Sequence, residues 1–285
     1  ISALQSILEN DIFPDENLYF RNNSTIYWQI LTDMENYFYG IYYKFQWDSG
    51  DTVAVIASDK ALQIMWEDQV YVSADLEKAE CDFDSGRLVF SVADGNFKAW
   101  ADIRFLHRSP LSYDIMGPFK FAPDIVCKHK VYSMESCALG EMTIQGKSYR
   151  LSEARVYVEG DRGRSFPDRY MWVHCFLPNG SMMMAVARLT VMKKNFTGII
   201  CVVQEGGHQY RLATYLGAKP RVAGPETVIV TQRGLRLTVS VHKNRGEAFR
   251  LLAPRNGKMA STIKECLSGE TDIELKKGNR TIISA

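Results

Sequence analysis

The sequence predicts an all-β protein made of antiparallel sheets. Two observations carry this prediction. Hydrophobic and polar residues alternate along most of the chain, and short glycine-containing turns such as 48–50, 84–86 and 178–180 separate the alternating segments. Alternation with a period of two is typical of strands that bury one face, and short turns join antiparallel neighbours. Only residues 3–10 have a pattern that favours a helix.

The expected strands follow one another closely. The first is rich in aromatic residues and covers 37–46, and the turn after it favours a hairpin with 52–57. The segment 61–66 fits either a helix or a strand. Further strands are expected at 69–74, 87–92, 96–105, 149–159, 170–177, 182–190, 197–204, 226–231, 235–242 and 247–252.

The passage 110–123 is the best candidate for a crossover between two β-units. It holds three of the nine prolines of the chain, and proline cannot donate a hydrogen bond to a central strand ladder. A chain of 285 residues is long enough for one large β-domain or two smaller ones. We therefore expect a boundary near Pro123, with an N-terminal β-domain at 1–123 and a C-terminal β-domain at 124–285.

The composition excludes several classes of protein. Lys plus Arg number 34 and Asp plus Glu 33, so the formal charge is +1, and binding to nucleic acid, which needs a basic excess, is not expected. The chain has no apolar run of about 18 residues that would span a membrane. No secretory signal is visible in a chain that begins at Ile1. Motifs for serine hydrolysis, phosphate loops, zinc proteases and nicotinamide binding are absent as well.

Cysteine usage predicts reduced thiols. The six cysteines lie at 81, 127, 137, 175, 201 and 266, and no pair has C-x-x-C spacing. A zinc ribbon or a redox pair is therefore not expected, and a chain of this size needs no disulfide to fold. Free thiols favour a cytoplasmic location.

Residues 157–167, YVEGDRGRSFP, combine two acids with two arginines. Glu159 and Asp161 share one face of an extended chain. If that face borders an apolar pocket, desolvation and mutual repulsion raise at least one carboxyl pKa, which would supply a general acid near neutral pH. The alternative is a structural corner in which Arg162 or Arg164 bridges the acids. We favour the structural corner, because structural ion pairs also perturb carboxyl groups.

Cys127 and His129 would share one face of a strand and could together ligate a metal. No further ligand cluster is evident in the sequence, and a pair does not complete the usual three or four ligands. We therefore expect His129 to be a hydrogen-bonded histidine beside a pocket, with no metal and no cofactor.

Aromatic and methionine residues mark candidate walls of that pocket. Tyr39 and Tyr42 lie on the first strand, whose aromatics occupy both faces, so each residue lies in a core or in a pocket wall that could stabilise a carbocation. Trp172 and His174 would share a face of a later strand. Met183, in a run of three methionines, is either an adaptable lining or ordinary core packing.

An ordered series of motifs resembles the tocopherol cyclase-like family, which is related to lipocalin-like carotenoid hydratases and stress-survival proteins. The series consists of Met116–Phe119, Cys127-x-His129, Ser133-Met134, Glu159-x-Asp161-x-Gly163-x-x-Phe166-Pro167 and Trp172, and the resemblance returns at 263–269. It runs from about residue 36 to about residue 275. The chain departs from the family pattern at Tyr39, Ile41, Val126, Gly160 and Arg162.

The resemblance implies two lipocalin-like antiparallel β-barrel or sandwich halves packed together around an apolar pocket. It implies a hydrophobic ligand, either a prenylated phenol, a lipid or an isoprenoid, and leaves peripheral contact with a membrane open. In the family's plant enzymes an acid protonates a prenyl double bond and a phenol oxygen closes the ring, which needs no cofactor. A non-catalytic carrier and a scaffold with a filled core remain alternatives.

The residues expected at the site fall into two groups. The candidate catalytic residues are Glu159, Asp161 and His129, and the candidate ligand-binding residues are Tyr39, Tyr42, Phe166, Trp172, His174 and Met183.

Overall fold

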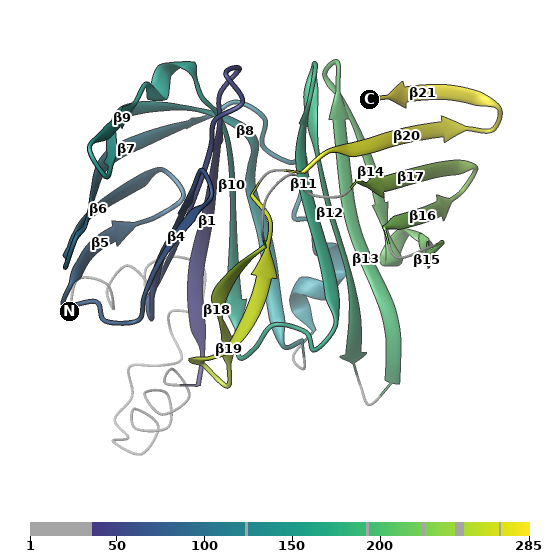
Figure 1. Ribbon diagram of the computed structural model, residues 1–285. Helices are drawn as coiled ribbons and strands as arrows, with labels where there is room; N and C mark the ends of the chain where they lie inside the picture. The colour runs from purple at the N-terminus through teal and green to yellow at the C-terminus, as the bar shows by residue number, and fades with distance from the viewer. Residues whose placement is uncertain (1–35, 123–124, 192–193, 224–225, 243–247, 268) are drawn as a thin grey trace, which may run out of the picture. The chain divides into compact units, whose positions relative to one another are not determined.

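The structure, a computed structural model, describes residues 36–122, 125–191, 194–223, 226–242, 248–267 and 269–285, all within one compact unit. These residues form β-strands joined by turns and three short 3-10 helices (Figure 1), so the predicted all-β fold is confirmed. The ambiguous segment 61–66 forms a strand, whereas the candidate helix at 3–10 lies outside the described residues. In the described part, no helix has the length and apolar character needed to cross a bilayer.

Sheet 1 curls into a nearly closed barrel in the order β4-β3-β2-β1-β10-β8-β7-β6-β5, with β9 paired to β8. All of its neighbouring strands are antiparallel. Its strands are β1 (Phe38–Gln46), β2 (Thr52–Ser58), β3 (Leu62–Trp66), β4 (Gln69–Ser73), β5 (Ala79–Phe83), β6 (Arg87–Asp94), β7 (Phe97–His107), β8 (Cys127–Ile144), β9 (Lys147–Tyr149) and β10 (Arg155–Gly163). The sheet thus uses strands from both sides of residue 123, where the domain boundary was predicted.

Three smaller sheets follow sheet 1 in the chain. Sheet 2 contains β11 (Tyr170–Leu177), β12 (Gly180–Val191), β13 (Lys194–Glu205) and β14 (His208–Ala213). Sheet 3 contains β15 (Lys219–Val222), β16 (Thr227–Gln232), β17 (Leu235–Val241), β20 (Thr271–Lys277) and β21 (Arg280–Ser284). The hairpin of β18 (Phe249–Arg255) and β19 (Lys258–Glu265) forms a pair of its own, and Figure 1 shows it between sheet 1 and the other two sheets.

The interior of sheet 1 is filled with apolar side chains, and we call this filling the barrel core. On β1 it takes Ile41, Tyr43 and Phe45, each fully buried. The intervening residues Tyr42 and Lys44 point to the opposite face, because side chains alternate along a strand. Burial of these large side chains supplies much of the driving force for folding, and it leaves the outer face of β1 for a different use.

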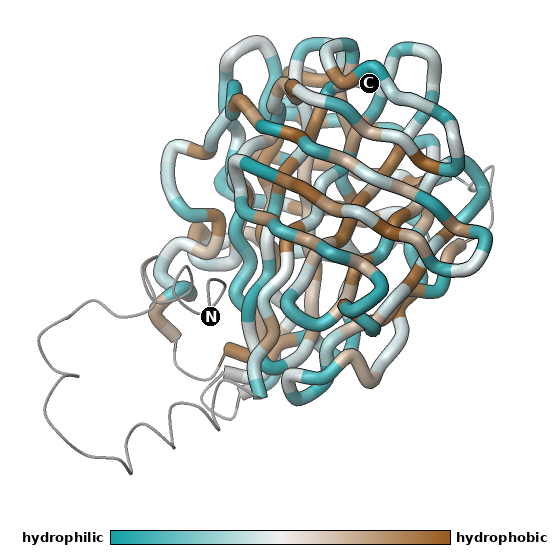
Figure 2. Tube along the Cα trace, turned by 90° about the vertical axis from the view of Figure 1, so that its left-hand side faces the viewer, coloured by the Kyte–Doolittle hydropathy of each residue, from teal (hydrophilic) through white to brown (hydrophobic). Residues whose placement is uncertain are grey.

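Sheet 2 lies between two apolar layers. Met182 and Met184 pack into a core shared with sheet 3, whereas Met183 belongs to the layer that faces sheet 1. Figure 2 shows hydropathy along the trace, with hydrophobic positions concentrated in the strands and hydrophilic ones in the turns. The alternation seen in the sequence thus assigns neighbouring methionines to different cores.

The proline-rich passage was predicted to cross between two β-units, but it connects β7 to β8, which are antiparallel neighbours within sheet 1. It contains the 3-10 helix η1 (Gly117–Phe121). Arg211 of β14 fixes this passage by donating to the backbone oxygens of Tyr113 and Asp114 at 2.8 and 2.9 Å. Tyr215 donates to the backbone oxygen of Ile115 at 2.9 Å. The other two 3-10 helices are η2 (Leu151–Glu153) and η3 (Thr214–Leu216).

Candidate active site

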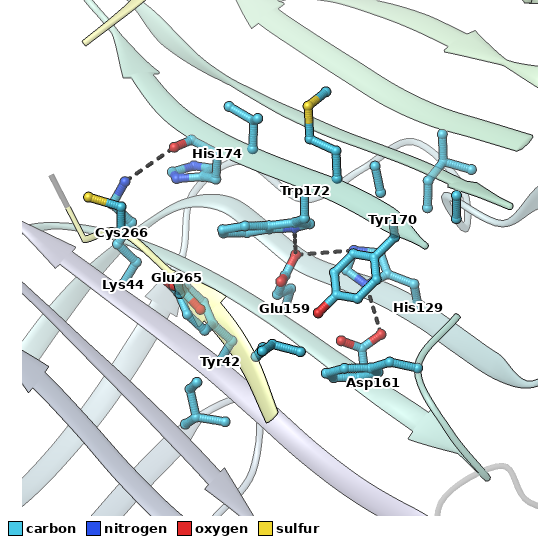
Figure 3. Close-up of a pocket in the computed structure, with 18 of the residues that line it drawn as sticks. Tyr42, Lys44, His129, Glu159, Asp161, Tyr170, Trp172, His174, Glu265 and Cys266 are labelled. Carbon is cyan, nitrogen blue, oxygen red and sulfur yellow. Dashed lines mark hydrogen bonds and ion pairs between the residues drawn. The ribbon is translucent and has the colours of Figure 1, made fainter. Parts of the chain in front are cut away.

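A cavity of about 1230 Å³ lies on the outer face of β1 and β10, with β11 and the β18–β19 hairpin supplying its other walls. The hairpin is held to sheet 1 by reciprocal hydrogen bonds between the Gln63 side chain and the backbone of Leu252, at 2.7 and 3.1 Å. Most of the lining is aromatic or aliphatic, and a small set of ionisable side chains converges on it (Figure 3). The site is thus outside the barrel, between packed sheets.

Strand register explains why the predicted residues meet. β1 and β10 pair so that Tyr42 lies opposite Glu159, and β10 and β8 pair so that Asp161 lies opposite His129. Directly opposite residues share a face, so the three polar side chains of β8 and β10 point into the same space. The close pairing at the end of β10 requires Gly163, where a Cβ atom would collide with the backbone oxygen of Val126.

His129 is held between two carboxylates. Its Nδ1 lies 2.9 Å from Oδ1 of Asp161, and its Nε2 lies 3.1 Å from Oε2 of Glu159. The second contact has ion-pair distance without hydrogen-bond alignment. The Cys127 thiol also donates to Asp161, with 3.4 Å between sulfur and oxygen. Burial lowers the pKa of His129, but the adjacent charges of Glu159 and Asp161 outweigh it and raise that pKa well above its ordinary value.

Glu159 is a buried acceptor for several donors. Its Oε2 accepts hydrogen bonds from the Tyr157 hydroxyl at 2.5 Å and from the Trp172 indole at 3.1 Å, and it faces His129 as well. Both hydrogen bonds and the adjacent imidazole direct the positive ends of their dipoles or charge toward this one oxygen. Glu159 is therefore suited to hold negative charge in the cavity.

The predicted salt-bridge corner is wrong. Neither Arg162 nor Arg164 forms an ion pair with Glu159 or Asp161, because His129 occupies the position between the two acids. Arg164 instead lies over the ring of Tyr37, with 5.2 Å to its centroid. Alternation explains the difference, since Arg162 follows Asp161 on the strand and therefore points to the opposite face.

A third carboxyl group, Glu265 at the end of β19, enters the cavity from the hairpin. Its Oε1 accepts a hydrogen bond from the Tyr42 hydroxyl at 2.6 Å. Burial, together with the charge of Glu159, raises the pKa of Glu265 to about 7, although the hydrogen bond from Tyr42 and the charge of Lys44 act in the opposite direction. Glu265 therefore loses its proton near neutral pH and not in the acidic range of an ordinary carboxyl group.

The structure separates the predicted ligand-binding residues into two groups. Tyr42, Phe166, Trp172 and His174 line the cavity. Tyr39 does not, because it points to the other face of β1 and stacks on Phe83 in the barrel core at 5.8 Å. Met183 is fully buried in the layer beneath the cavity and is not part of its lining.

The arrangement favours an ion-pair network over a metal centre. Ligand atoms of His129, Glu159 and Asp161 lie within 4.8 Å of one another, which is close enough for shared coordination. The two carboxylates, however, face different nitrogens of the ring, so no single nitrogen could join both at one ion. The raised pKa also favours imidazolium, whereas metals bind neutral imidazole.

Sequence reasoning missed Glu265, Lys44 and Tyr157. The sequence carried a signal for each of them. Lys44 is two residues from Tyr42, and Tyr157 is two residues from Glu159, so both share a face with a residue that was identified. Glu265 lies within 263–269, where the family resemblance returned, but nothing local shows that the hairpin closes over the cavity.

Residues 127–285 match a family model described as tocopherol cyclase-like. The chain belongs to this family. The match includes β8, β10, β11 and β19, so it covers every ionisable cavity residue described above except those on β1. No curated protein matches the chain.

Among solved structures, kievitone hydratase from Nectria haematococca is similar with a TM-score of 0.53 and 9% identity, over 87% of this chain and 86% of that one. At this identity the likeness shows the fold alone, and it supports a lipocalin-like architecture. A putative AttH protein from Nitrosomonas europaea has a TM-score of 0.42 and 7% identity, over 85% of this chain and 88% of that one.

Proposed function

We propose that this protein binds an isoprenoid or otherwise prenylated small molecule in the cavity and catalyses an acid-dependent cyclisation or isomerisation at its carbon–carbon double bond. The observation that carries the proposal is a pair of carboxyl groups in one aromatic-lined cavity, Glu159 buried and Glu265 half-buried, each with a different environment. Among the described residues Glu265 accepts from Tyr42 alone, and its pKa is about 7. Glu159 accepts from Tyr157 and Trp172 and faces His129.

Glu265 is the proton donor in this proposal. Transfer of its proton to the double bond leaves a carboxylate on the protein and a carbocation on the ligand. An acid with a pKa near the operating pH suits general acid catalysis, because it is substantially protonated and is still able to transfer its proton. Burial supplies this pKa here, as in other enzymes that use a carboxylic acid near neutral pH.

Glu159 and the aromatic side chains stabilise the developing positive charge. A carboxylate held in place beside the reacting carbon lowers the energy of the positive charge that develops there. The rings of Tyr42 and Trp172 pack edge to face with 5.2 Å between centroids, and aromatic faces attract cations. In the cyclisation, a hydroxyl of the ligand forms the new C–O bond and releases its proton to a carboxylate, so reactant and product have the same composition.

His129 and Asp161 position Glu159 in this scheme. The imidazole fills the space between the two acids and neutralises part of their charge. Without it, the buried carboxylate of Glu159 and the half-buried one of Asp161 would repel each other. Two of the five residues altered relative to the family pattern, Tyr39 and Arg162, lie on the strand faces opposite to the cavity residues.

The second candidate function is a carrier that binds the same class of molecule without converting it. It is favoured by the volume of the cavity, about 1230 Å³, which lies just above the upper end of the range of small-molecule sites, roughly 300–1,000 Å³. The carrier function requires the aromatic lining and none of the acids.

The test is incubation of the full chain with prenylated phenols and acyclic isoprenoid alcohols, followed by mass spectrometry and NMR of the products. A product of unchanged mass with a new ring or a moved double bond supports the proposal. Glu265→Gln keeps the shape and the hydrogen bond from Tyr42 but cannot donate the proton, so its turnover should fall at least about a hundredfold.

Glu80→Gln, an exposed change on β5, is the matched control and should retain full activity. Binding of these compounds by a wild-type protein that leaves all of them unchanged contradicts the catalytic proposal and supports the carrier. Equal turnover by the Glu265→Gln variant contradicts the assignment of the proton donor.

A further inference from the structure

Lys44 lies on the cavity side of β1 with unused hydrogen-bonding capacity. Its Nζ donates to the backbone oxygen of His174 at 3.2 Å, and within the described residues no carboxylate lies at ion-pair distance from it. An ammonium carries three donors, so two remain for another partner. The side chain is buried, and this burial lowers the pKa of Lys44.

The side chain of His174 on β11 also has unused hydrogen-bonding capacity. This side chain is buried, with 6% of the residue exposed, and neither ring nitrogen has a hydrogen-bond partner among the residues that the structure describes. Burial and the nearby charges of Lys44 and Arg155 hold the pKa of His174 well below its ordinary value. The neutral ring therefore offers one donor and one acceptor. Polar groups buried without a partner are rare in native proteins, so both nitrogens call for an explanation.

The ring of His174 is fixed where it can serve a ligand. It stacks on Tyr157 with 3.8 Å between centroids and meets the edge of Phe176 at 4.8 Å. Both Lys44 and His174 line the cavity. Figure 3 shows them with Cys266 at one end of the labelled residues, while His129 and Asp161 lie at the other end.

Strand register gives the separation of the two ends. Lys44 pairs with Tyr157, Tyr42 with Glu159, and Gly40 with Asp161. Four residues along a strand correspond to roughly 13 Å. The cavity therefore has Lys44 and His174 at one end and a second polar group at the other, with Tyr42, Trp172 and the carboxyl groups of Glu159 and Glu265 between them. A length of this order accommodates an elongated molecule whose head lies at the Lys44 end.

We propose that Lys44 and His174 form a head-group subsite that binds the carboxylate of an isoprenoid or long-chain acid. The inference deepens the proposed function, because it rests on the cavity as the binding site and names the polar end of the ligand. Lys44 supplies the positive charge, and the N–H of His174 supplies a second donor. A carboxylate has two oxygens that can accept both.

The charge available favours a singly charged head over a phosphate. Arg155 is the other cation close to His174, and three of its five N–H donors are directed to the backbone oxygens of Leu177 and Gly180 and to the carboxylate of Glu135, which balances its charge. Lys44 therefore faces the head group with one positive charge. Glu265, which is nearby and readily protonated, adds no strong repulsion when a second carboxylate enters.

The test compares oleic acid, its methyl ester and oleyl alcohol as ligands of the full chain, by displacement of a fluorescent fatty-acid probe and by calorimetry at pH 7. The three share one apolar body and differ in the head. The wild type should bind the acid at least about tenfold more tightly than the ester, since a hydrogen bond to a charged group contributes that much discrimination. Lys44→Met should remove this preference and leave ester binding unchanged.

His174→Phe retains the stacking on Tyr157 and should weaken binding of the acid alone, by a smaller factor. Lys98→Met, an exposed change on β7, is the matched control and should retain the preference. Lys44→Gln serves as a second variant should the methionine variant fail to fold, and thermal melting verifies folding of each.

Equal wild-type affinity for acid, ester and alcohol overturns the head-group inference and leaves the proposed function standing. A preference that survives in both the Lys44 and the His174 variants also overturns it, because the head would then bind elsewhere. Failure of all three ligands to bind contradicts the cavity as a lipid site, and with it the proposed function.

Discussion

The two faces of β1 have similar residue types and opposite roles. On the inner face, Ile41, Tyr43 and Phe45 are fully buried in the barrel core. On the outer face, Tyr42 and Lys44 are buried too, but their polar ends reach Glu265 and the backbone of His174. The inner face is a packing surface that tolerates no gap, whereas the outer face borders an open cavity. Burial alone therefore does not distinguish structural residues from functional ones, and hydrogen-bond partners across sheets do.

The largest effect is expected on the inner face. Phe45→Ala should lower the free energy of unfolding by about 3–5 kcal/mol, because it removes a large buried ring and leaves a cavity in a close-packed core. Urea unfolding measures the change. Leu106→Ala, at an exposed apolar residue, should change stability by less than about 0.5 kcal/mol. A small loss of stability in Phe45→Ala would show that the barrel core is loosely packed. It would contradict the distinction between a close-packed inner face and an outer face that borders a cavity.

Glu265 should make stability depend on pH. Burial raises its pKa from about 4.5 to about 7, so the folded protein keeps this proton where the unfolded chain has lost it. Stability should therefore fall as pH rises from about 4.5 to about 7 and then level off, by about 3 kcal/mol from this group. Glu265→Gln should remove the part of this pH-dependent loss of stability that Glu265 causes.

Urea unfolding of the wild type and the Glu265→Gln variant at pH 4, 6 and 8 measures this difference. The free energy of unfolding of the variant should increase relative to that of the wild type as pH rises, so that the variant is the more stable protein at pH 8. Parallel stability curves would mean that Glu265 is solvated, which would remove the basis for its role as proton donor.

Glu159→Gln should lower the pKa of His129. The carboxylate of Glu159 helps to raise that pKa, and its loss leaves Asp161 as the remaining acidic partner. The raised pKa of His129 stabilises the folded protein fully below about pH 6.5, and this contribution is lost as pH rises through the pKa of the folded state. Because the pKa is raised less in the variant, its free energy of unfolding should fall by a smaller amount at alkaline pH. We expect it to be less stable by about 1–3 kcal/mol at neutral pH.

NMR titration of the His129 ring measures the shift directly. An unchanged titration in Glu159→Gln would mean that Asp161 alone sets the pKa, and Asp161→Asn would then be the variant that lowers it. Either result separates this buried network from the exposed pair of His242 and Asp272, whose Nε2–Oδ2 distance is 2.7 Å.

The smallest effect is expected when tyrosines on the two faces of β1 are replaced one at a time. Tyr42→Phe removes the hydrogen bond that stabilises ionised Glu265, so the pKa of Glu265 should rise further and stability should fall by about 1 kcal/mol. Tyr39→Phe, on the inner face, should leave the titration of Glu265 unchanged. Infrared spectroscopy of the carboxyl C=O stretch reports this titration, and identical spectra for the two variants would contradict the assignment.

Much of the fold was predictable because it depends on local pattern. Alternation and turns identified most strands, and period two placed Glu159 with Asp161 and Trp172 with His174 on shared faces. The motif series also identified the family that the match to residues 127–285 shows. These properties need only the chain near each residue, because a strand face is fixed by the spacing of side chains along it.

Tertiary structure decided what each face meets. Register between β8 and β10 placed His129 between the two acids, where the sequence favoured an arginine. The curl of sheet 1 directed Tyr39 inward, and the packing of the β18–β19 hairpin brought Glu265 to Tyr42, 223 residues away in the chain. The pKa of about 7 at Glu265 follows from burial by these distant segments. Desolvation and charge depend on everything within a few ångströms, and no local pattern records those neighbours.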